Sequence, residues 1–207
     1  MFSALNHKNT KIAVIGLGYV GLPLAVEFGK KFPVVGYDID TLRIEELTNR
    51  YDKTGEIKGN EINYLSNVYF TCDKKELVEC NVYIVTVPTP ITDENVPDLS
   101  LIIGASRTLG EVIKKGDIIV YESTVYPGAT EEICVPELEQ ASGLKFKSDF
   151  SIGYSPERIN PGDSSRRLTD ITKIVSGSCE KTLEFLASMY GQIISAGIHK
   201  TKSIKIA

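Results

Sequence analysis

The feature that most constrains the fold is a glycine-rich turn, GLGYVG at residues 16–21, which lies between a strand pattern and a helix pattern. The apolar, β-branched run KIAVIG (11–16) precedes it, and Val20, Leu24 and Phe28 follow at helical spacing. Apolar side chains four residues apart lie on one face of a helix. A G-x-G-x-x-G pattern alone is weak evidence, but in this context it predicts a dinucleotide-binding site.

Each glycine of the turn has a physical role in that prediction. Gly16 permits the tight turn, Gly18 lets the backbone approach a pyrophosphate, and Gly21 lets the helix pack closely on the strand. The phosphates would lie at the amino terminus of the helix, where free N–H groups and the helix dipole favour negative charge.

Asp38 ends the next predicted strand, about 20 residues after the turn. Its carboxylate is expected to accept hydrogen bonds from the adenosine ribose hydroxyls and to repel a 2′-phosphate, which favours NAD over NADP. Arg43 is the complication, because a nearby arginine could instead accommodate the 2′-phosphate of NADP.

Short apolar runs alternate with helical patterns along the chain. The runs that predict buried strands are 11–16, 32–40, 81–88, 116–124 and 150–156. Parallel strands need long crossover connections, which are usually helices. We therefore expect a Rossmann-like α/β fold: a doubly wound, mainly parallel sheet with helices on both faces.

The carboxyl-terminal part is expected to continue this sheet, with a strand at 172–176, a helix at 179–190 and a strand at 192–195. Residues 1–200 would form one NAD-binding domain. Residues 201–207 would begin a further helix, whose pattern stops as soon as it starts. We therefore expect the chain to be part of a longer protein.

Composition excludes several kinds of partner. With 42% hydrophobic and 24% charged residues the chain is expected to be soluble and globular. A net charge of -4 and the lack of a Lys/Arg-rich block argue against nucleic acid. The opening residues do not resemble a signal peptide, and no run reaches the roughly 18 apolar residues of a membrane span. We expect a cytoplasmic protein with no membrane partner.

The four cysteines are scattered, without the C-x-x-C spacing of a metal site: Cys72, Cys80, Cys134 and Cys179. We expect core thiols, with no disulfide, no metal and no nucleophile among them.

Three loops follow predicted strands: VTVPTP (85–90), YESTVYPGATEE (121–132) and SPERINPGD (155–163). Ligands of open α/β sheets bind outside the carboxyl ends of the strands, so these loops should converge on the cofactor. The residue types alone leave open whether Thr124 is a helix-cap hydroxyl, and whether Glu157 and Arg158 form a solvated surface pair.

Taken in order and spacing, KIAVIGLGYVGLPLA, GYDID, VTVPTP, YESTVYPGATEE and GYSPERINPGD resemble the UDP-glucose/GDP-mannose dehydrogenase family. Its members oxidise the C6 alcohol of a nucleotide sugar to a carboxylate with two NAD, through a cysteine-bound thiohemiacetal and thioester. The SPERINPGD loop is most similar to the branch acting on UDP-N-acetylhexosamines. The resemblance implies a UDP-sugar substrate and a role in capsule or O-antigen sugar supply.

The resemblance also implies roles for individual residues. Glu157 and Thr124 would help to position the hydrolytic water, and a carboxylate beside a hydroxyl is suited to that task. A second glutamate of the UDP-glucose enzymes is replaced here by Pro161, which weakens any cofactor contact there. The residues implied to contact NAD are Tyr19, Val20, Asp38, Arg43, Thr89 and Thr124, and those implied to face the sugar nucleotide are Glu157, Arg158 and Ile159.

The family's catalytic lysine and asparagine, its nucleophilic cysteine and the central helix of its homodimer lie beyond residue 207. The resemblance thus implies that this chain binds NAD without turning over substrate. The alternatives are a UDP-glucose or GDP-mannose dehydrogenase, and a non-catalytic module that binds NAD.

Overall fold

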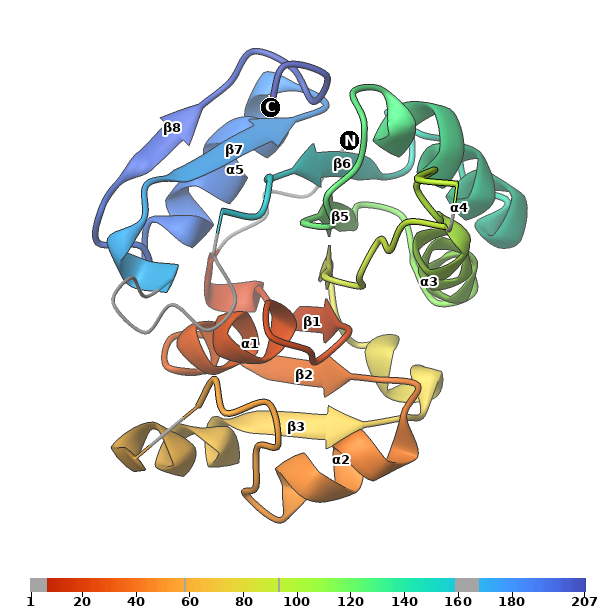
Figure 1. Cartoon of the computed structure of the whole chain (residues 1–207). Helices are drawn as coiled ribbons and strands as arrows, with labels where there is room; N and C mark the ends of the chain where they lie inside the picture. The colour runs from red at the N-terminus through yellow and green to blue at the C-terminus, as the bar shows by residue number, and fades with distance from the viewer. Residues whose placement is uncertain (1–6, 58, 93, 159–167) are drawn as a thin grey trace.

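The computed structural model of the chain describes residues 7–57, 59–92, 94–158 and 168–207. These residues form an eight-stranded sheet in the order β3-β2-β1-β4-β5-β6-β7-β8 (Figure 1). The strands are β1 Ile12–Ile15, β2 Val34–Tyr37, β3 Val68–Thr71, β4 Val82–Val85, β5 Ile118–Tyr121, β6 Ser151–Tyr154, β7 Lys173–Gly177 and β8 Ile198–Lys200.

Every strand pair is parallel except β6 with β7, which is antiparallel. The order reverses at β1, which has β2 on one side and β4 on the other. Such a reversal opens a crevice at the carboxyl ends of the strands, where ligands bind in this class of fold. The predicted Rossmann-like, mainly parallel sheet is confirmed.

Helices cover both faces of the sheet (Figure 1). The α-helices are α1 Gly21–Gly29, α2 Thr41–Thr48, α3 Ser100–Gly110, α4 Val135–Ser142 and α5 Glu180–Tyr190. The remaining helical elements are the 3-10 helices η1 His7–Asn9, η2 Gly59–Asn67, η3 Lys74–Leu77 and η5 Leu168–Asp170, and the π-helical η4 Thr130–Cys134. Within the described ranges, no helix has the length and apolar character needed to cross a bilayer.

Alternation along the strands builds a separate core on each face. Ile12 and Val14 of β1 pack in one core with α1 and α5, whereas Ala13 and Ile15 pack in the other with α3 and α4. Successive side chains of a strand point to opposite faces, so a strand covered on both sides is apolar throughout. This is why the continuous apolar runs predicted the strands correctly.

One strand prediction was wrong, and one edge strand of the sheet was not predicted. Residues 192–195 form turns after α5, in which Ile193 and Ile194 are buried in the core, and the last strand is instead Ile198–Lys200. The edge strand Val68–Thr71 was not predicted at all, and its Tyr69 is 57% exposed. Edge strands need little apolar surface, so their sequences carry a weak signal.

The last residues form a turn in which Ile206 N and Ala207 N donate to Ser203 O. The helix expected to begin at 201–207 stays a prediction.

Candidate cofactor site

A cleft of about 1020 Å³ opens at the carboxyl edge of the sheet, beside β1 and β4. Small-molecule sites occupy about 300–1,000 Å³, so the cleft has room for an extended dinucleotide. The cleft is lined by predicted site residues from separate loops: Gly16, Gly18, Tyr19, Val20, Asp38, Thr89, Thr124 and Glu157. The fold therefore brings together most of the residues expected to act together.

The glycine turn has the geometry that a pyrophosphate site requires. Gly16 has φ +92°, a conformation that L side chains rarely adopt. A Cβ at Gly21 would lie 1.8 Å from Gly16 O, so only glycine lets α1 start this close to the turn. A Cβ at Gly18 would meet no protein atom within 4 Å, and Gly18 lines the cleft. The chain thus offers a ligand bare backbone at the amino terminus of α1, which fits a bound diphosphate.

Asp38 is fixed by the backbone around it. Its Oδ2 accepts from Leu17 N at 2.8 Å and its Oδ1 from Asp40 N at 3.0 Å. Carboxylate oxygens have further lone pairs, so the ribose hydroxyls can still be bound. The sequence prediction for Asp38 fits its position in the cleft.

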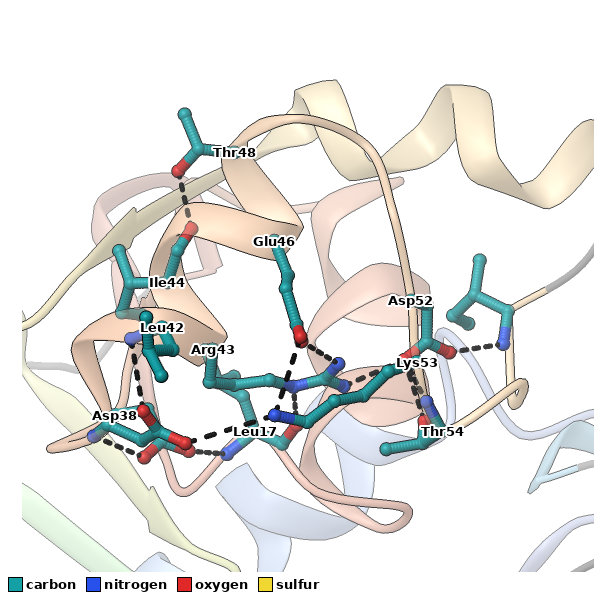
Figure 2. A network of polar contacts seen from close by, with 12 residues as sticks. Leu17, Asp38, Leu42, Arg43, Ile44, Glu46, Thr48, Asp52, Lys53 and Thr54 are labelled. Atoms are coloured by element: carbon teal, nitrogen blue, oxygen red, sulfur yellow. Dashed lines mark hydrogen bonds and ion pairs between the residues drawn. The ribbon is translucent and has the colours of Figure 1, made fainter.

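The sequence analysis expected Arg43 to contact NAD, but its side chain does not line the cleft. Its side chain is 5% exposed, its Nε donates to Leu17 O at 2.9 Å, and its Nη2 lies 2.9 Å from Asp52 Oδ1 (Figure 2). Arg43 does not line the cleft but lies beneath the glycine turn. A direct contact with NAD would require the guanidinium to leave these partners, so that role stays a prediction without support from the geometry.

The loops after β4 and β5 are tied to each other at the far side of the cleft. Thr89 Oγ1 donates to Thr124 O at 2.6 Å, and Ser123 Oγ donates to Val87 O at 2.6 Å. Thr86, at the end of β4, places its Oγ1 2.7 Å from Gly16 O and so ties β4 to the glycine turn. The position of Thr124 is thereby fixed relative to the turn.

The third loop is described only in part. Glu157 lines the cleft, and its Oε1 accepts from Arg158 N at 2.7 Å. The Arg158 side chain is exposed and donates from Nη1 to Thr172 O at 3.1 Å, away from the residues that line the cleft. Ile159 lies outside the described residues. The sugar-nucleotide contacts of Arg158 and Ile159 stay predictions.

The sequence analysis missed a buried charged cluster in the cleft wall. Glu122, which lines the cleft, pairs with Lys173 Nζ at 2.6 Å and accepts a hydrogen bond from the Tyr190 hydroxyl. Burial and the neighbouring Glu122 carboxylate raise the pKa of Tyr190, which keeps its hydroxyl a donor. The signal was a single charged residue at the end or start of an apolar run, at Glu122 and again at Lys173.

Apolar residues at the cleft rim were also missed. Ile39 is 74% exposed, Ile91 is 65% exposed and Leu101 is 39% exposed, and all three line the cleft. Exposed apolar groups gathered at a hollow indicate a surface that a ligand covers. They suit the flat apolar faces of an adenine ring.

The cysteine prediction was half right. Cys80 and Cys134 are buried, and burial raises the pKa of each thiol to about 11, which makes them poor nucleophiles. Cys72 and Cys179 are exposed, contrary to the expectation of core thiols. All four cysteines belong to the described part of the chain, and none of them lines the cleft.

Comparison with known protein families gives a match over most of the chain. Residues 10–194 match the NAD-binding domain of the UDP-glucose/GDP-mannose dehydrogenase family. The chain belongs to this family. The cofactor expected from Asp38, NAD, is that of the matched domain.

Relatives support the assignment along nearly the whole chain. A UDP-N-acetyl-D-glucosamine 6-dehydrogenase of Pseudomonas aeruginosa is 56% identical over 97% of this chain and 47% of its own length. Protein CapL of Staphylococcus aureus is 52% identical over 96% of this chain and 47% of its own length. This chain therefore spans about half the length of the curated relatives it matches.

Solved structures of the family share the fold. The UDP-D-ManNAc dehydrogenase of Pyrococcus horikoshii superposes with a TM-score of 0.81 at 32% identity, over 94% of this chain and 47% of that one. An NDP-N-acetyl-D-galactosaminuronic acid dehydrogenase of Methanosarcina mazei superposes with a TM-score of 0.86 at 27% identity, over 95% of this chain and 45% of that one.

Proposed function

We propose that the chain is the cofactor-binding half of an NAD-dependent dehydrogenase that oxidises the C6 alcohol of a UDP-N-acetylhexosamine to the uronate. The observation that carries the proposal is the cleft, because one hollow is lined by the phosphate-binding turn, Asp38, Thr124 and Glu157. The cleft combines a place for a dinucleotide with a carboxylate and a hydroxyl suited to acid–base work.

The choice among sugars rests on relatives. Proteins named UDP-N-acetyl-D-glucosamine 6-dehydrogenase are 56% identical to this chain, whereas several named UDP-N-acetyl-D-mannosamine dehydrogenase are 32–34% identical. This difference favours UDP-N-acetylglucosamine as the substrate. A cytoplasmic location, a homodimeric full-length enzyme and a role in capsule or O-antigen precursor synthesis belong to the same proposal.

The residues of this chain would divide the work along the cleft. The glycine turn and the start of α1 would hold the pyrophosphate of NAD, and Asp38 would hold its adenosine ribose. NAD, when bound, would supply the hydride acceptor for the two oxidations at the sugar C6. Thr124 and Glu157 lie in the same cleft, where they would position the water that supplies the second carboxylate oxygen.

The test is a substrate panel on the full-length protein. We expect NAD-dependent oxidation of UDP-N-acetylglucosamine, with two NADH formed per sugar, to exceed that of UDP-N-acetylgalactosamine, UDP-N-acetylmannosamine, UDP-glucose and GDP-mannose. Preference for UDP-glucose or GDP-mannose would overturn the hexosamine proposal. NAD binding without oxidation of any sugar would identify a non-catalytic module.

A matched pair of variants tests the role of Glu157. Glu157→Gln should lower kcat by about 10²- to 10⁴-fold, the usual contribution of a general acid or base, while the Kd for NAD stays within about twofold. Glu79→Gln is the control. Glu79 is exposed and precedes β4, so it lies at the amino ends of the parallel strands, opposite the cleft. Equal rates for the two variants would remove Glu157 from the mechanism.

A further inference from the structure

The guanidinium of Arg43 makes one hydrogen bond, from Nε, and ion-pair contacts at Nη1 and Nη2, neither of which forms a hydrogen bond. Nε donates to Leu17 O at 2.9 Å, Nη2 lies 2.9 Å from Asp52 Oδ1, and Nη1 lies 3.5 Å from Glu46 Oε2. Figure 2 shows these groups closing around the side chain from the turn, from α2 and from the loop after α2. Arg43 is thereby directed away from the cleft, although it follows Asp38 closely in sequence.

Asp52 is itself held rigidly by its own loop. Its Oδ1 accepts from Thr54 N at 3.1 Å and from Thr54 Oγ1 at 2.7 Å, and its Oδ2 accepts from Ile57 N at 3.0 Å. The Asp52 side chain is only 1% exposed. It therefore presents a fixed, desolvated negative charge to Arg43.

Leu17 connects this pair to the acid that faces the cleft. Its carbonyl accepts from Arg43, while its N–H donates to Asp38 Oδ2 at 2.8 Å. Leu17 stands between Gly16 and Gly18, so the same residue forms part of the phosphate-binding turn. Asp52, Arg43, Leu17 and Asp38 thus form one continuous chain of contacts.

We infer that Asp52 is a positioning residue that sets the choice between NAD and NADP, by holding Arg43 beneath the glycine turn. An arginine near the acidic residue of this fold can accommodate the 2′-phosphate of NADP. Arg43 could reach that phosphate only by leaving Leu17 O and by stranding the buried Asp52 carboxylate without its counter-charge, which is strongly unfavourable. The same contacts hold Leu17 and Asp38 in place for the ribose of NAD.

Asp52→Asn in the 207-residue chain tests the inference. Asparagine keeps the size of the side chain and one of the two acceptor oxygens. It removes the charge that binds Arg43, and its NH2 group replaces the other oxygen, which costs the loop one N–H acceptor. Calorimetric titration with NAD and with NADP should show the ratio of Kd for NADP to Kd for NAD falling by about tenfold or more. An unchanged ratio, including equal weakening of both cofactors, would show that Asp52 is only a structural residue.

The double variant Arg43→Met with Asp52→Asn identifies the group responsible. Both the double variant and Arg43→Met lack the guanidinium. The ratio of Kd for NADP to Kd for NAD should therefore agree between them to within about twofold. If the ratio stays shifted, Arg43 does not carry the effect and the inference fails.

Asp117→Asn is the matched control. Asp117 is also a buried acid that accepts a backbone N–H bond, from Lys114 N at 2.9 Å. It immediately precedes β5, however, and so lies at the amino ends of the parallel strands, opposite the cleft. In Asp117→Asn the ratio of Kd for NADP to Kd for NAD should equal that of the unmodified chain. A shift as large as that of Asp52→Asn would overturn the inference.

Thr54→Val replaces Asp52→Asn if that variant does not fold. It removes the 2.7 Å hydroxyl contact to Asp52 and leaves the charge in place, so a smaller shift in the same direction is expected. No shift would count against the inference. Because these titrations contain no sugar, their failure and the failure of the sugar oxidation proposal are independent.

Discussion

Lys173 Nζ lies 2.6 Å from Glu122 Oε2 in the interior of the protein, where the two side chains are 4% and 0% exposed. The contact joins the end of β5, from which the Ser123 and Thr124 loop leaves, to the start of β7. It therefore links the wall of the cofactor cleft to the carboxyl-terminal part of the sheet.

Removing one partner of this pair should be costly. Lys173→Met leaves the Glu122 carboxylate buried without its counter-charge, and such a loss destabilises by about 3–5 kcal/mol. Urea unfolding measures the effect. Adding Glu122→Gln to Lys173→Met should recover much of the loss, and a double variant no more stable than Lys173→Met would show that burial of the charge is not the cause.

Alanine at either of two glycines of the turn should weaken NAD binding, but only one of the two substitutions should lower the melting temperature. Gly21→Ala places a Cβ 1.8 Å from Gly16 O, so both the melting temperature and NAD binding should fall. Gly18→Ala meets no protein atom within 4 Å, so the melting temperature should stay unchanged while NAD binding weakens by at least about tenfold. Unchanged NAD affinity in Gly18→Ala would show that the diphosphate does not pass over this residue.

Asp38→Ala should weaken NAD binding markedly. Hydrogen bonds to charged groups contribute about 1.5–3 kcal/mol, which corresponds to roughly 10- to 150-fold in Kd measured by calorimetry. Asp40→Ala is the control, because Asp40 also accepts a backbone N–H bond, from Leu42 N, but does not line the cleft. Equal affinities for the two variants would mean that the ribose contact is misassigned.

Two buried aspartates, Asp52 and Asp117, should make the stability of the protein depend on pH in opposite ways. Burial alone would raise the pKa of Asp52, but hydrogen bonds from Ile57 and Thr54 and the Arg43 contact outweigh it and lower the pKa below 3.8. Its stabilising contribution is complete above 3.8 and is lost as pH falls through the folded-state pKa. The stability advantage of the unmodified chain over Asp52→Asn should therefore shrink as the solution is acidified below 3.8.

Burial raises the pKa of Asp117 above 3.8, and the contacts with Lys114 only partly offset it. Ionised Asp117 therefore costs stability, and the cost disappears as pH falls through its raised pKa towards 3.8. Free energies of unfolding across this range, for the unmodified chain and Asp117→Asn, should converge on acidification. If Asp52→Asn and Asp117→Asn follow the same pH profile, the assigned pKa directions are wrong.

The parts of the fold that the sequence predicted are those governed by local rules. The run at 11–16 became Ile12–Ile15 because a strand covered on both faces must be apolar throughout. The edge strand Ile198–Lys200 escaped prediction because two of its three side chains are exposed. Residues 192–195 were wrongly predicted as a strand because Ile193 and Ile194 lie in a turn that is buried in the core, and a buried turn is apolar too.

The sequence by itself determined the local unit of strand, turn, helix and strand that contains Gly16, Gly18, Gly21 and Asp38, and from it predicted a dinucleotide site. Only the tertiary structure decided the partners of the charged residues. Arg43 turns inward because the loop after α2 carries Asp52 under the glycine turn, and Glu122 meets Lys173 because the chain places β7 beside β6 and not at the other edge. A charge in a sequence does not specify which distant charge it will meet, since that depends on the order of the strands and on which groups lose their water together.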